Sequence, residues 1–123
     1  MLGIDLTARD IQSEAKAKGH PWTLAKGFNG AAPVSEFLDP KGFSDLQNIH
    51  FTCDINGERR QNGFTGDMIF SVKHLLTYLT QFITIKKGDL IFTGTPSGVG
   101  PLSIGDHIEA HLEGKKKMDF HVR

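Results

Sequence analysis

Apolar and polar side chains alternate most regularly over residues 49–55, where every second residue is apolar. A period of two is typical of a half-buried strand. Asn56-Gly57 follows directly and is a strong signal for a two-residue hairpin turn, so residues 58–61 are expected to return as the partner strand. Further strands are predicted at 90–93, 106–112 and 116–122, the last two joined at Glu113-Gly114.

A helix is predicted at about residues 8–18. Thr7 and Asp10 form a Thr-x-x-Asp pair, a variant of the capping box, so Thr7 is expected to cap the N-terminus of this helix. Gly19 and Pro21 supply the signal that ends it.

A second helix is predicted at about 72–82, because Ser71 can cap it and apolar residues recur on one face. Residues 20–43 are rich in Gly and Pro and are expected to be irregular or short-stranded. Two short helices among many strands predict an α+β fold that is mainly β, in a single domain over residues 1–123.

The chain opens on Leu2-Gly3-Ile4-Asp5, which has the pattern of a strand end running straight into the first helix. A strand at the edge of a domain needs neighbours to pair with, so we expect that the fold lacks its N-terminal part. Core-facing residues such as Phe51 and Leu90 would then be exposed, which favours tight dimerisation or aggregation.

Composition narrows the classes of function. Lys plus Arg and Asp plus Glu number 14 each, and this balance argues against a nucleic-acid partner, because phosphate binding normally comes with a basic excess. The single cysteine, Cys53, excludes an internal disulfide and suits a buried strand position better than a nucleophile's role. No apolar stretch reaches the roughly 18 residues of a membrane span, and the opening residues do not form a signal peptide. We therefore expect a cytoplasmic protein that binds neither nucleic acid nor membrane.

Three side chains near the first helix are candidates for chemistry. Asp5 directly precedes the helix, and a carboxylate at a strand end is a hard-oxygen ligand suited to Mg²⁺ or Mn²⁺. Arg9 and Gln12 share one face of the opening turns, where an arginine can bind a substrate carboxylate through two hydrogen bonds. The same pattern also fits an Asp that favours the helix dipole beside an exposed Arg, and spacing alone favours this second interpretation.

Lys26 stands between apolar and glycine neighbours. A partly desolvated lysine is a strong electrostatic partner for an anion or an enolate. A loop lysine that extends to water is the alternative, which composition favours slightly.

The glycine-rich stretch 94–100 contains neither a Walker A sequence nor a dinucleotide fingerprint. Such a loop can direct backbone N–H groups at an anion, with the Thr95 hydroxyl as a further donor, and a tight turn between strands fits equally well. Residues 58–60 are expected at the surface. The six histidines lack the spacing of a metal site.

Five segments are informative in combination: Asp5–Gln12, Pro21–Phe28, Gly66–Phe70, Gly88–Ile91 and Gly94–Gly100. In this order they resemble the fumarylacetoacetate hydrolase family, most of all the C-terminal part of its short acylpyruvase and oxaloacetate decarboxylase-like members. The resemblance covers essentially the whole chain.

The resemblance implies a mixed β-sandwich roll, usually a homodimer or higher oligomer, with a Mg²⁺ or Mn²⁺ site and a small oxo acid as substrate. Such enzymes act on 2-oxo and 2,4-dioxo acids, by acylpyruvate C–C hydrolysis or oxaloacetate decarboxylation. By this resemblance Asp5 is a metal ligand, and Arg9 and Gln12 hold the oxo-acid end of the substrate. By the same resemblance, Lys26 is expected to be the catalytic residue that stabilises the developing enolate, and Thr95 is expected to bind a carboxylate.

The chain departs from the family in its metal ligands. The family adds a Glu-x-Glu pair and a water-activating His/Glu pair upstream of the aspartate, and neither has a counterpart here. A single carboxylate would hold Mg²⁺ weakly. Two hypotheses stay open: a metal-dependent enzyme, and a non-catalytic binding or assembly module or inactive truncated paralogue. An oligonucleotide-binding barrel is disfavoured, because no basic-aromatic face is evident.

Overall fold

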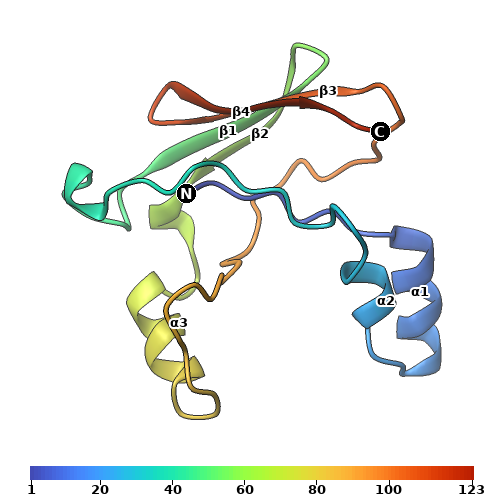
Figure 1. The fold of residues 1–123 in the computed structure, drawn as a ribbon, viewed down its shortest axis with the longest axis horizontal. Helices are drawn as coiled ribbons and strands as arrows, with labels where there is room; N and C mark the ends of the chain where they lie inside the picture. The colour runs from blue at the N-terminus through green and yellow to red at the C-terminus, as the bar shows by residue number, and fades with distance from the viewer.

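In the computed structural model, which describes residues 1–123, four strands form one antiparallel sheet in the order β2-β1-β3-β4. The strands are β1 (His50–Ile55), β2 (Glu58–Phe64), β3 (His107–Leu112) and β4 (Lys115–His121). Helices α1 (Arg9–Lys18) and α2 (Thr23–Lys26) lie below one end of the sheet, and α3 (Val72–Leu79) lies below the other (Figure 1). Two short 3₁₀ turns, Pro40–Gly42 and Thr65–Asp67, complete the elements. The expected α+β, mainly β class is confirmed.

Both hairpins of the sheet turn on two residues with positive φ. The φ angles are 53° and 80° at Asn56 and Gly57, and 49° and 71° at Glu113 and Gly114. Positive φ at both central residues is the geometry of a type I′ turn, whose twist matches that of the flanking strands. Both predicted hairpins are therefore confirmed, with β2 continuing to Phe64.

The core lies against one face of β3 and β4. Ile108, Ala110 and Leu112 are buried on alternate positions of β3, and Met118 of β4 joins them, as the period of a strand requires. Other large apolar side chains are exposed: Phe37, Ile69, Phe82 and Leu90, the last as expected. Phe51 was expected to be exposed but is half-buried. Its ring lies against Gly63, where an added Cβ would be 2.4 Å from a ring atom.

Two predicted strands are not formed as strands. The segment 90–93 has no backbone hydrogen bond to any partner, so the apolar run alone does not make it part of the sheet. The opening residues form only an isolated antiparallel bridge between Gly3 and Val34, supported by a hydrogen bond from the Ile4 N–H to the Pro33 carbonyl at 3.0 Å. A strand is defined by its ladder of partners, which an apolar pattern does not specify.

Helix α1 begins one residue later than predicted and has no side-chain cap. It starts at Arg9, after Ala8, and it ends where Gly19 adopts a φ of 66°, as predicted. The prediction that Thr7 caps the helix is wrong, for a reason that lies in the site described below.

Helix α3 begins as predicted but is shorter. The Ser71 hydroxyl accepts a hydrogen bond from the His74 backbone N–H at 3.1 Å and so caps the helix. The helix ends at Leu79, where the Thr80 hydroxyl donates back to the carbonyl groups of the preceding turn. Helix α2 lies in the stretch that was expected to be irregular or short-stranded.

Candidate functional site

Backbone hydrogen bonds bring Asp5 and Lys26 together. The residue after Asp5, Leu6, donates its N–H to the Ala31 carbonyl at 2.8 Å. Ala8 donates to the carbonyl of Ala25 at 3.0 Å, and Ala25 is fully buried beside Lys26, the last residue of α2. These backbone hydrogen bonds therefore hold the segment that carries Asp5 next to the segment that carries Lys26.

The Lys26 ammonium is held between a carboxylate and a hydroxyl. Its Nζ donates to Asp5 Oδ2 and to Thr7 Oγ1, each at 2.7 Å. The side chain of Lys26 is 34% exposed and that of Asp5 is 48% exposed, so the pair lies at the protein surface. Because α1 begins at Arg9, Ala8 stands at its N-cap position, and the Thr7 hydroxyl accepts from Lys26 instead of capping the helix.

Arg9 and Gln12 contact each other on the first turn of α1. Arg9 Nη1 donates to Gln12 Oε1 at 2.6 Å. A guanidinium carries five N–H donors, so this bond leaves several of them free for a ligand. Gln12 orients Arg9 in this arrangement.

The glycine-rich loop 94–100 is docked on β2. Gly98 has a φ of 100°, and a Cβ added there would lie 1.9 Å from the Arg60 carbonyl oxygen, so only glycine permits this approach. Gln61 Nε2 donates to Thr95 Oγ1 at 2.8 Å and to the Pro96 carbonyl at 3.1 Å. Two neighbouring residues of β2, Arg60 and Gln61, thus hold the loop and Thr95 against the sheet.

A cavity of about 880 Å³ joins these segments. Asp5, Arg9, Lys26 and Thr95 all line it, whereas Gln12 does not. Four of the five residues that the sequence analysis selected therefore surround one space, although they come from three separate parts of the chain.

Two further residues of the cavity wall were not selected from the sequence. Arg60, expected at the surface, is exposed but lines the cavity, and Gln61 lies next to it. Arg9, Lys26 and Arg60 are the basic residues of the wall and Asp5 is its one acidic residue. This excess of basic residues favours an anionic ligand. The wall offers only one carboxylate, that of Asp5, as a ligand for a hard cation.

Cys53 also lines the cavity, from β1. Burial raises the pKa of its thiol, and the neighbouring Asp54 raises it further. A thiol with a raised pKa stays protonated and is a poor nucleophile. Cys53 therefore lies in a strand, as expected, but it is half-buried where a buried position was expected.

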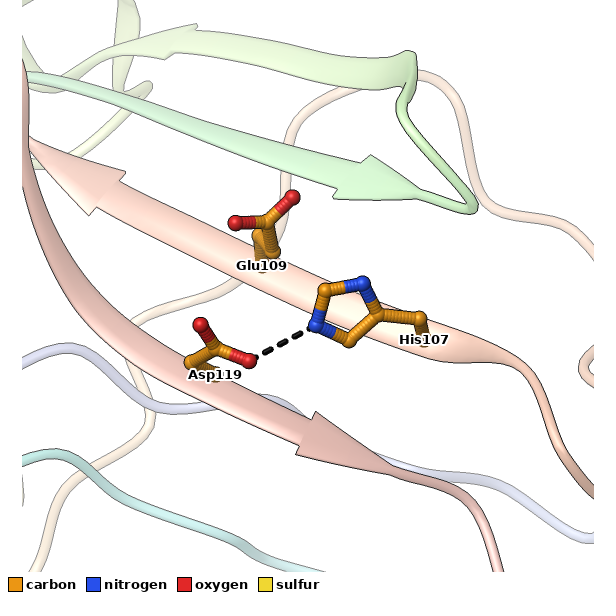
Figure 2. Close-up of side chains that lie close together, drawn as sticks. All are labelled: His107, Glu109 and Asp119. Atoms are coloured by element: carbon orange, nitrogen blue, oxygen red, sulfur yellow. Dashed lines mark hydrogen bonds and ion pairs between the residues drawn. The ribbon is translucent and has the colours of Figure 1, made fainter.

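Figure 2 shows a second group of charged side chains, His107 and Glu109 of β3 with Asp119 of β4. One ligand atom of each lies within 4.8 Å of the others, which is close enough to hold a metal ion. However, Lys116 Nζ already lies 2.9 Å from Glu109 and 2.5 Å from Asp119. Hydrogen bonds from His107 and Lys116 lower the pKa of Asp119 to about 2. The group therefore already has a cation, the Lys116 ammonium, and none of its three residues lines the cavity.

Comparison with known proteins defines the class of this chain. A family model described as "Fumarylacetoacetate (FAA) hydrolase C-terminal" matches residues 1–123. The chain belongs to the fumarylacetoacetate hydrolase family, and the resemblance seen in the sequence is confirmed.

Among its relatives, the mouse protein named oxaloacetate tautomerase FAHD1, mitochondrial, is 47% identical over 122 residues, which cover 99% of this chain and 55% of that protein. The mitochondrial oxaloacetate decarboxylase of Dictyostelium discoideum is 45% identical over 113 residues, which cover 92% of this chain and 52% of that protein. The chain thus spans about half the length of the curated relatives it matches.

Solved structures of the family superpose closely. A family protein from Yersinia pestis CO92 matches with a TM-score of 0.94 and 40% identity, covering 98% of this chain and 57% of that one. The fumarylpyruvate hydrolase of Pseudomonas aeruginosa, in complex with Mn²⁺ and pyruvate, matches with a TM-score of 0.91 and 31% identity, covering 98% of this chain and 52% of that one.

None of the helices is both long enough and apolar enough to cross a membrane. Because several relatives are mitochondrial by name, the cytoplasmic location expected from the sequence stays a prediction.

Proposed function

We propose that this chain binds small 2-oxo or 2,4-dioxo acids at a divalent-metal site and takes part in acylpyruvate hydrolysis or oxaloacetate decarboxylation. The observation that carries the proposal is the single cavity lined by Asp5, Arg9, Lys26 and Thr95. Relatives named for oxaloacetate chemistry, and a structural neighbour that holds Mn²⁺ and pyruvate, support the choice of substrate class.

The basic side chains would bind the acid. Arg9, oriented by Gln12, presents free N–H groups that suit a carboxylate in a paired arrangement. Thr95 offers a hydroxyl on the opposite segment of the wall. A ligand held between the helix and the loop would place its 2-oxo group toward Lys26.

Lys26 would stabilise the negative charge that develops on the enolate oxygen. An ammonium has three N–H donors, and two of them are directed at Asp5 and Thr7. The third is free to donate to a ligand, and the first two fix its direction before the ligand arrives. Such preorganised donors remove several kcal/mol from a barrier.

Asp5 would hold Mg²⁺ or Mn²⁺ through the carboxylate oxygen that Lys26 does not engage. As the one carboxylate of the cavity wall, it forms an incomplete site with weak affinity. A bound ion would supply Lewis acidity to the 2-oxo group of the acid.

A non-catalytic binding or assembly module is the second candidate, and the lone carboxylate favours it. In that case the cavity binds an oxo acid without turnover, and the chain acts through association with another copy or a paralogue. The large exposed apolar side chains are consistent with such a surface.

The test is turnover of acetylpyruvate or oxaloacetate by the purified chain with Mn²⁺ or Mg²⁺, above the rate with the ion alone. We expect turnover that is lost in Asp5→Ala and Lys26→Ala. Asp10→Ala is the matched control, because Asp10 is an exposed carboxylate that does not line the cavity. Binding of oxalate without turnover would leave the second candidate, and absence of both binding and turnover would refute both.

A further inference from the structure

The amide of Gln61 links the wall of β2 to the glycine-rich loop. Its nitrogen lies 3.1 Å from the Pro96 carbonyl oxygen. A carbonyl oxygen can only accept, so the group that faces it must be the NH₂ side of the amide. The second hydrogen of the same nitrogen reaches Thr95 Oγ1, at 2.8 Å.

This contact decides what the Thr95 hydroxyl can do. A hydroxyl carries one hydrogen and accepts through its lone pairs. Oγ1 accepts from Gln61 and makes no other hydrogen bond in the structure. The hydrogen of the hydroxyl therefore has no acceptor in the protein and can be donated to a ligand. Both residues line the cavity that also contains Arg9 and Lys26.

We infer that Gln61 is a positioning residue that fixes the Thr95 hydroxyl as a hydrogen-bond donor to a carboxylate oxygen of an anion in the cavity. The inference rests on the proposed function, since it assigns the orientation of one group in that site. It goes beyond that function in naming a residue of β2 that acts through the loop without requiring contact with the acid.

A second contact also holds the loop against β2. Gly98 lies against the carbonyl of Arg60, the residue before Gln61, so the loop touches β2 at two neighbouring positions. Gln61 is half-buried and lies opposite Cys53 of the central strand β1. Pairing with β1 therefore holds the backbone from which this amide extends.

A double-mutant cycle tests the inference through the dissociation constant for oxalate in the presence of Mn²⁺. We expect Thr95→Ala to weaken binding about tenfold and Gln61→Leu about fivefold. If Gln61 acts through Thr95, the double variant is about as weak as Thr95→Ala alone. Independent effects would multiply to roughly fiftyfold and overturn the inference, as would an unchanged constant for Gln61→Leu. Gln81→Leu, the same change at an exposed position outside the cavity, is the control.

A second measurement needs no ligand. The Gln61 side-chain amide signals in the NMR spectrum should shift in Thr95→Ala, and the amide protons of residues 94–100 should exchange faster with solvent in Gln61→Leu. Failure of the wild-type chain to bind oxalate would refute the proposed function. The amide signals would still decide the positioning, and signals that are identical in Thr95→Ala and wild type would overturn it.

Discussion

Replacing Lys26 by methionine keeps most of the unbranched apolar side chain and removes the ammonium that donates to Asp5 and Thr7. The ion pair with Asp5 lies at the surface, so its loss costs about 0.5 kcal/mol. The hydrogen bond to Thr7 contributes about 1 kcal/mol more. The free energy of unfolding should therefore fall by about 1.5 kcal/mol. For a chain of this length the unfolding entropy is roughly 0.25 kcal/mol/K, so the Tm should fall by about 6 °C.

Urea and thermal unfolding followed by circular dichroism measure this loss. Lys18→Met is the control, because Lys18 makes an exposed pair with Glu14 on α1 at 2.6 Å, which contributes only about 0.4 kcal/mol. Equal losses in the two variants would refute the reasoning, because Lys26 would then be held no more firmly than a surface lysine. A gain in stability for Lys26→Met would refute it too.

Three further outcomes are expected. Gly98→Ala should lower the free energy of unfolding by roughly 3 kcal/mol, because it combines an unfavourable φ with a clash against Arg60, while Gly30→Ala, with φ 80° and open space, should cost only about 1 kcal/mol in the same urea titration. Asp119 has a pKa lowered from 3.8 to about 2, so its stabilising contribution is complete above about pH 4 and is lost as the pH falls through 2. The difference in urea midpoint between wild type and Asp119→Asn should accordingly shrink over that interval, and a constant difference would contradict the assignment. In size-exclusion chromatography the chain should elute as a dimer or larger species because of its exposed apolar side chains, and a well-behaved monomer would count against this expectation.

Local signals in the sequence predicted the parts of the fold that depend on neighbouring residues. Asn56-Gly57 specifies its own turn because both positions tolerate positive φ, and Ser71 caps the helix that follows it directly. Thr7 has the same kind of local signal, yet its hydroxyl accepts from Lys26, a residue 19 positions away. A tertiary partner overrides a capping preference when it offers a charged donor.

The candidate site could be predicted only in part, for a related reason. Asp5 and Lys26 were selected because the family resemblance names them. Spacing alone favoured a helix-dipole role for Asp5, and composition slightly favoured a loop lysine that extends to water for Lys26. Gln61 and Arg60 gave no such signal, because their contacts are made with the loop at 94–100, which is far from them in the sequence. No pattern within β2 records that contact.

The cavity wall concentrates basic groups in a molecule that carries no net charge at pH 7. The remaining surface must then hold an excess of acidic over basic side chains, so the protein has the character of a dipole. An approaching small anion is repelled weakly by the outside and attracted once it is within about 8 Å of the cavity at physiological salt. Isoelectric focusing would report a protein without net charge near pH 7, while the rate at which the proposed anionic ligand binds would still depend on ionic strength.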